Sequence, residues 1–278
     1  MNKIILGNCL EELKTIESNS IDLIYIDPPF NTGNDQIKTS ITTTEHINGD
    51  RIGFGQKRYS TTVVSKMFYQ DNIPEYHEFM SKCLKESFRV LRSTGNMFIH
   101  LDQREVHYVK IIMDGIFDRD NYVESIYWTW DYGARTKKKF PIKTNEILWY
   151  AKEVNNYYFD ITECDRIPYM SPDLVGKEKT EFGKYPTNCW WLSIVGTNSH
   201  EKTGYPTQKP YKLLERIVKT ACPINGMVLD FFAGSGTTGE AAIRNNREFI
   251  LIDNNDVAIS VIKERLGNFT KGLMYKNV

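Results

Sequence analysis

The sequence predicts an α/β fold in which helices cover a largely parallel sheet, and three observations support this. Short apolar runs suited to buried strands alternate with segments in which apolar residues recur at helical spacing. One apolar run, 21–26, leads into an acid-proline-proline-aromatic sequence, and another, 227–231, leads into a glycine-rich turn. Hydrophobic residues make up 41% of the 278 residues, which is enough for the core of one large domain with an insertion.

The individual elements follow from these patterns. Short apolar runs predict strands at residues 3–6, 21–26, 96–101, 122–130, 146–151, 227–231 and 248–253. Apolar residues spaced three or four apart predict helices at 9–16, from about 75 to Gly95, from 106 onward, and at 210–221, 237–245 and 256–266.

Two segments break the alternation and divide the chain. Residues 31–70 show no steady period and are predicted to be a long loop, which inside a compact domain is usually functional or disordered. Residues 155–200 are rich in Tyr, Pro, Gly, Thr and Asn and are predicted to be a small inserted module. The predicted parts are therefore 1–154, 155–200 and 201–278.

Composition excludes some classes of protein and leaves others open. Lys and Arg total 35, as do Asp and Glu, so the net charge is +0 and argues neither for nor against a nucleic-acid partner. The N-terminal apolar run is too short for a signal peptide, and no segment is long enough to span a membrane. The five cysteines lack metal-binding spacing, so we expect no metal and a reducing, cytoplasmic setting.

The glycine-rich turn, residues 234–239, follows a strand and opens a helix. Glycines allow a tight turn and a close backbone approach, and the helix start offers free N–H groups. Asp253 ends the next strand and could hydrogen-bond ribose hydroxyls. The pattern also fits a dinucleotide fingerprint, so a nicotinamide or flavin enzyme is an alternative. Asp230, at the strand tip, would repel a pyrophosphate but suits the cationic part of S-adenosylmethionine.

The acid-proline-proline-aromatic segment and the glycine turn together resemble the motifs of amino-methyltransferases that act on DNA. Their order, with the catalytic motif first, resembles the permuted β class. The resemblance covers nearly the whole chain outside 34–70 and 155–200. It implies a Rossmann-like fold of S-adenosylmethionine-dependent methyltransferases, with a mostly parallel seven-stranded sheet, and it makes 155–200 the target-recognition region.

The resemblance also implies S-adenosylmethionine as the cofactor. Residues 205–210 resemble the family segment beside the methionine part of the cofactor, and Gly7-Asn8 resembles a Gly-Asp pair beside its adenine. Asn8 is a departure, although its carbonyl can still accept a hydrogen bond. The predicted cofactor contacts are Asn8, Asp27, Lys209, Asp230, Phe231, Ala233, Gly234, Ser235, Gly236, Thr237, Thr238 and Asp253.

The predicted catalytic residues are Asp27, Pro28, Pro29 and Phe30. An exocyclic amino nitrogen is a weak nucleophile because its lone pair is delocalised into the ring. Asp27 and the carbonyl of Pro28, held rigidly by the following proline, can accept its two N–H groups, and Phe30 can stack on the ring. Family members with Ser in place of the acid tend to methylate cytosine N4, so the acid here indicates adenine N6.

The predicted DNA contacts are Arg135, Lys137, Lys138 and Lys139, which follow Trp128, Trp130 and Tyr132. Cations beside aromatic rings suit phosphate contacts next to stacking. The predicted function is a site-specific DNA adenine-N6 methyltransferase that flips its target base from a duplex. Alternatives are a cytosine-N4 or RNA methyltransferase, a nicotinamide oxidoreductase, and a catalytically inactive DNA-binding subunit. A homodimer and a companion restriction endonuclease are further partners that the resemblance admits, in a prokaryote or phage.

Overall fold

The computed structural model describes residues 2–33, 36–52, 56–69, 71, 73–133, 136–196, 199–267, 269 and 274–277. The chain forms two compact units. The larger unit comprises residues 1–30 and 75–278, and the smaller comprises 31–74. In the described part of the chain, no helix is long and apolar enough to cross a membrane.

A nine-stranded sheet runs through the larger unit in the order β12-β1-β11-β10-β2-β6-β8-β7-β9. Its strands are β1 Lys3–Leu6, β2 Ile21–Ile26, β6 Leu91–Leu101, β7 Tyr122–Thr129, β8 Thr144–Ala151, β9 Cys189–Trp191, β10 Met227–Asp230, β11 Glu248–Asp253 and β12 Met274–Asn277. Neighbouring strands are parallel, except that β8 pairs antiparallel with both β6 and β7. The predicted mostly parallel α/β sheet is therefore confirmed.

The central seven strands of this sheet are the seven that the sequence predicts, and two edge strands are additional. β9 has three residues and β12 has four, so neither is long enough to show an apolar period. Each extends the sheet at one edge, β9 beside β7 and β12 beside β1.

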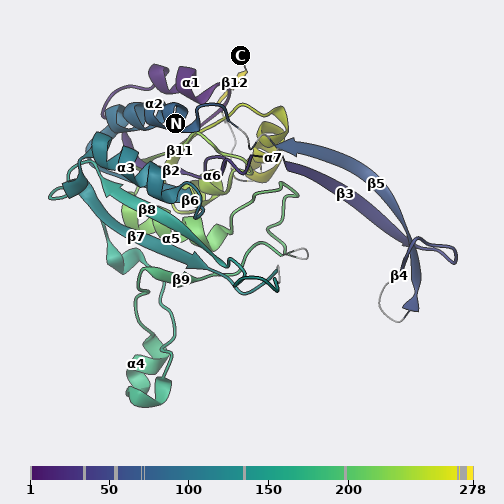
Figure 1. The fold of residues 1–278 in the computed structure, drawn as a ribbon. Coiled ribbons are helices and arrows are strands. Elements are labelled where there is room, and N and C mark those ends of the chain that lie inside the picture. The colour runs from purple at the N-terminus through teal and green to yellow at the C-terminus, as the bar shows by residue number, and fades with distance from the viewer. Residues whose placement is uncertain are drawn as a thin grey trace. The chain divides into compact units, whose positions relative to one another are not determined.

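Helices cover the sheet in two rows (Figure 1). One row contains α1 Cys9–Thr15, α2 Tyr76–Val90 and α3 Val106–Phe117, and the other contains α5 Tyr211–Ala221, α6 Thr237–Arg244 and α7 Asp256–Gly267. Ile217 of α5, Ala242 of α6 and Ile262 of α7 share one core with Leu23 and Tyr25, which are alternate residues of β2. Because side chains alternate across a strand, the second row of helices covers that face of β2.

The helix that was predicted to run to Gly95 ends earlier. α2 ends at Val90, β6 begins at Leu91, and Gly95 lies inside the strand. Leu91 completes the apolar stripe of the helix, yet it is extended and pairs with Ile21 of β2. One buried leucine satisfies both patterns, so periodicity could not locate the boundary.

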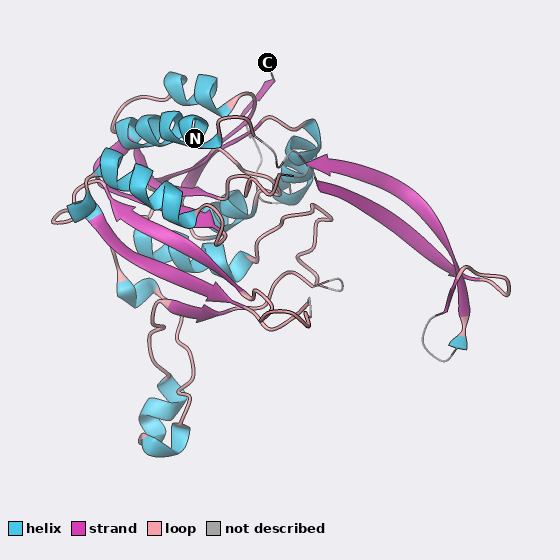
Figure 2. Cartoon of the chain, viewed as in Figure 1, coloured by secondary structure: helices cyan, strands magenta, loops and turns pink. Residues whose placement is uncertain are grey.

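The smaller unit is not a loop, and that prediction was wrong. It contains an antiparallel sheet of β3 Gln36–Glu45, β5 Arg58–Tyr69 and β4 Arg51–Ile52, in that order (Figure 2). The available signal was residue type rather than period. The strands contain runs of β-branched residues such as 41–44 and 61–64, which favour extended chain.

Residues 155–200 belong to the larger unit and contain little regular structure. Part of the segment leaves the sheet, carries α4 Lys177–Phe182, and returns to β9 (Figure 1). Ile167 and Lys184 close the base of this excursion through two backbone hydrogen bonds of 2.8 and 2.9 Å. Trp190 is buried and Trp191 is exposed.

Candidate active site

The segment from Asp27 to Phe30 begins at the carboxyl end of β2, between β10 and β6. All six residues of β2 are buried, and so is Pro28, whereas Pro29 and Phe30 are half-buried. The carboxylate of Asp27 forms an ion pair with Nζ of Lys209, and the two side chains are 15% and 11% exposed respectively. The same Nζ lies 5.4 Å from the centre of the Phe30 ring. Predicted site residues from opposite ends of the chain therefore meet.

The glycine turn joins β10 to α6 and takes a shape that requires glycine at two positions. Gly234 and Gly236 have φ values of +49° and +75°, in the left-handed region. A Cβ at Gly236 would also lie 2.9 Å from Cγ1 of Ile262 in α7. The turn thus brings bare backbone to the start of a helix, which is the arrangement that binds phosphate- or nucleoside-containing ligands.

Two acids at the ends of neighbouring strands hold this turn. Asp230 accepts hydrogen bonds from the N–H of Phe232 at 3.0 Å and from the hydroxyl of Thr238 at 2.6 Å. Asp253 accepts one from the N–H of Gly234 at 2.8 Å. Burial raises the pKa of Asp230 to about 7 and also raises the pKa of Asp253, while the hydrogen bonds act in the opposite direction. Both acids therefore shape the turn, and half-buried Asp253 keeps a face toward its surroundings.

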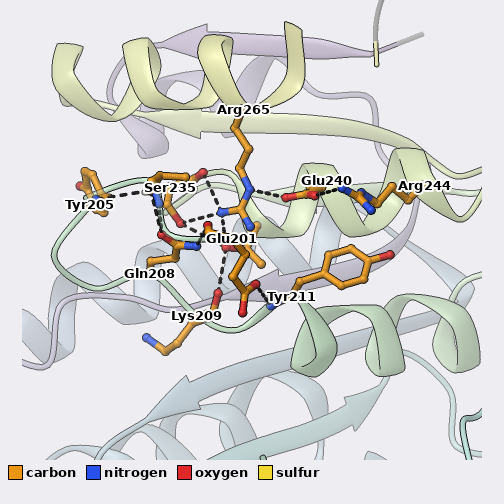
Figure 3. A network of polar contacts seen from close by, with 11 residues as sticks. Glu201, Tyr205, Gln208, Lys209, Tyr211, Ser235, Glu240, Arg244 and Arg265 are labelled. Carbon is orange, nitrogen blue, oxygen red and sulfur yellow. Dashed lines mark hydrogen bonds and ion pairs between the residues drawn. The ribbon is translucent and has the colours of Figure 1, made fainter. Parts of the chain in front are cut away.

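Arg265 of α7 is a site residue that the sequence analysis missed. Its buried guanidinium donates to the Thr237 hydroxyl at 2.8 Å and to the Ser235 carbonyl at 3.3 Å, and it pairs with Glu240 (Figure 3). These contacts fix the turn to the first residues of α6. The available signal was a charge next to the apolar stripe of α7, because a buried charge needs partners.

The segment that precedes α5 positions Lys209. The amide of Gln208 donates to the Glu201 carbonyl at 2.6 Å, and the Glu201 carboxylate accepts an N–H from the first turn of α5 at 2.7 Å (Figure 3). The Lys209 carbonyl accepts a hydrogen bond from the Thr237 hydroxyl at 3.2 Å. Lys209 consequently contacts the glycine turn through its backbone and Asp27 through its side chain.

The other predicted cofactor residues lie around the same strand ends. Phe231 and Ala233 are buried within the turn. Asn8 is exposed, and its carbonyl accepts an N–H from the first turn of α1 at 2.9 Å, so it caps that helix. The N–H of Gly7 donates to the backbone carbonyl of Asp253 at 3.0 Å, which places Asn8 next to the end of β11.

The predicted DNA contacts lie on the connection between β7 and β8. Lys137, Lys138 and Lys139 are exposed, whereas Arg135 lies outside the described residues. Trp128 is 4% exposed, and its indole N–H donates to a backbone carbonyl at 2.8 Å, so the expectation that it stacks at the surface was wrong. Its burial follows from its place in a strand that is covered on that face.

Comparison with known sequences gives a consistent result. The family model described as DNA methylase, N6_N4_Mtase, matches residues 21–264. The Type II methyltransferase M.HpaI of Haemophilus parainfluenzae is 29% identical, over 97% of this chain and 76% of its own length. The DNA adenine methyltransferase YhdJ of Escherichia coli K12 is 31% identical, over 95% of this chain and 82% of its own length.

Comparison with solved structures finds the same fold. The cytosine-N4-specific PvuII DNA methyltransferase superposes with a TM-score of 0.64 at 18% identity, covering 95% of this chain and 86% of its own. The complex of M1.HpyAVI with S-adenosylmethionine gives a TM-score of 0.61 at 20% identity, covering 96% of this chain and 99% of its own.

Proposed function

The chain belongs to the DNA methylase family N6_N4_Mtase and is an S-adenosylmethionine-dependent DNA methyltransferase, and on this premise we propose that it methylates N6 of adenine. The observation that carries the proposal is the position of Asp27, at the end of β2 and beside the glycine turn. An acid rather than a serine at this position favours adenine. The name of the relative YhdJ, a DNA adenine methyltransferase, agrees with this choice.

The residues of the glycine turn fit the cofactor. Gly234 and Gly236 leave space at the start of α6, and Asp253 ends the adjacent strand with a half-buried carboxylate. Asp230 puts negative charge below the turn, which suits a cation and opposes a pyrophosphate. When bound, S-adenosylmethionine supplies a methyl group on a positively charged sulfur. The chain's own residues then have to hold the base and direct its amino nitrogen.

The Asp27 segment performs that task in this proposal. The Asp27 carboxylate accepts one N–H of the adenine amino group, and the Pro28 carbonyl accepts the other. Together they draw the amino group away from conjugation with the ring and expose its lone pair. Phe30 stacks on the base and limits its tilt. Catalysis then depends on positioning and on acceptors that are already in place.

Duplex DNA has to be bound and opened for this chemistry, since a stacked base cannot reach the site. We assign phosphate contacts to Arg135 and to the exposed lysines 137–139. We assign target recognition to residues 155–200, whose α4 excursion carries Lys177, Lys179 and Lys184. A homodimer, a companion restriction endonuclease and a cytoplasmic location complete the proposal, because curated relatives are bacterial Type II methyltransferases.

The direct test uses tritium-labelled S-adenosylmethionine and duplex DNA that lacks adenine methylation. Digestion to nucleosides should place the label in N6-methyladenine, and sequencing of the modified DNA should give one short target site. Label in N4-methylcytosine would assign the chain to the other amino-methyltransferase specificity. Label in RNA alone, or no transfer at all, would overturn the proposal.

A further inference from the structure

His100 lies directly behind the predicted catalytic segment. It is in β6, next to β2, and its side chain has no exposed surface. Its ring stacks on the Phe30 ring, with 6.1 Å between centres and 27° between planes. On another side it meets the ring of Trp128 edge-on, at 5.4 Å. The imidazole therefore backs the ring that is proposed to hold the target base.

Both nitrogens of His100 are hydrogen-bonded. Nδ1 lies 2.9 Å from the hydroxyl of Tyr25, and Nε2 lies 2.9 Å from Nδ2 of Asn145. An amide NH₂ group can only donate, so Nε2 accepts, and a neutral ring then carries its proton on Nδ1. The ring is thus fixed at two opposite points, one on β2 and one on β8.

The imidazole is uncharged at neutral pH. Burial, and secondarily the positive charge of Lys209, hold the pKa of His100 well below its usual value. A second cation here would lie near Lys209, whose Nζ is 5.4 Å from the Phe30 ring. It would also repel the positive charge that develops on an amino nitrogen during methylation. Histidine therefore supplies two anchoring hydrogen bonds without adding charge.

We propose that His100, fixed by Asn145 and Tyr25, is a positioning residue that sets the plane of Phe30 and through it the plane of the flipped base. This inference rests on the proposed function. A phenylalanine at position 100 could stack equally well but would lose both anchors. Small errors in the placement of reacting groups cost up to about 100-fold in rate, so the loss should appear in kcat.

The test compares His100→Phe with His107→Phe, the same substitution at an exposed histidine on α3. His100→Phe should lower kcat on duplex DNA by about 10- to 100-fold and keep S-adenosylmethionine affinity within about twofold in calorimetry. His107→Phe should match the parent in both. Asn145→Leu should lower kcat in the same direction, and the double variant should be no slower than His100→Phe alone, because both act through one link.

A base-specific signal separates positioning from general damage. With 2-aminopurine at the mapped target adenine, His100→Phe should still flip the base but give an altered fluorescence intensity in the bound state. Unchanged kcat and fluorescence in an active protein would overturn the inference alone. A parent chain without DNA methylation would overturn the proposed function and this inference with it. If His100→Phe does not fold, nitrogen-15 NMR of the parent decides, since an imidazolium or an Nε2–H ring at pH 7 contradicts the arrangement.

Discussion

Replacing Lys209 by methionine tests the ion pair that joins the two halves of the site. The substitution removes the cation but keeps a side chain of similar length. Because Asp27 is only 15% exposed, the remaining carboxylate has little access to water. Removing one member of a buried pair costs about 3–5 kcal/mol, and this residual exposure places the expected loss near 3 kcal/mol. For a chain of this size the melting temperature should fall by about 6–12 °C.

Thermal unfolding followed by circular dichroism measures this loss. Lys212→Met is the matched control, because Lys212 is 47% exposed and lies 3.1 Å from Glu215, so its pair should contribute at most about 1 kcal/mol. Adding Asp27→Asn to Lys209→Met should restore most of the lost stability, since no buried charge is then left without its partner. The reasoning is refuted if the Lys209 and Lys212 variants melt together, or if Asp27→Asn restores nothing.

Four further outcomes are expected. Asp27→Ala should abolish tritium transfer to DNA while calorimetry shows nearly unchanged cofactor affinity, and normal turnover would exclude Asp27 from the chemistry. Asp253→Ala and Gly236→Val should each weaken S-adenosylmethionine binding, the first by about 1.5–3 kcal/mol for a lost charge-assisted hydrogen bond, and unchanged calorimetric affinity in both would contradict the site. Alanine at lysines 137–139 should flatten the plot of log DNA affinity against log salt by about 0.9 for each phosphate contact, alike on all sequences, whereas an unchanged slope would remove these lysines from the interface. Asp230, with its folded pKa raised to about 7, contributes stability that is fully present below about pH 4 and lost as the pH rises through 7, so Asp230→Asn should weaken this pH dependence in urea unfolding between pH 4 and 8.

The sequence was sufficient for much of the fold because the central strands are short, apolar and buried. Asp27, Asp230 and Asp253 follow such runs directly, and the carboxyl ends of parallel strands share one edge of a sheet, so their proximity could be predicted. Arg265 and His100 could not be assigned in the same way. Each is a single polar residue within an apolar pattern, and its role depends on partners that are distant in sequence.

The ribbon of β3 and β5 was missed for a different reason. Its strands lie outside the unit that contains the large sheet, so no shared core imposes the alternation that marks a half-buried strand. The assignment of residues 155–200 to target recognition stays a prediction. Recognition depends on which side chains reach base edges, and composition does not specify that.

The pairing of β2 with β10 also sets a timetable for synthesis. The N–H of Met227, at the start of β10, donates to the carboxylate of Asp22, 205 residues earlier, at 2.7 Å. At roughly 5–20 residues per second, a ribosome finishes β2 about 10–40 s before it makes the strand that covers this edge. β6 can cover the opposite edge sooner, but an uncovered apolar strand edge is a site at which nascent chains join one another. Placing the catalytic segment first therefore makes this protein dependent on chaperones for a large part of its translation.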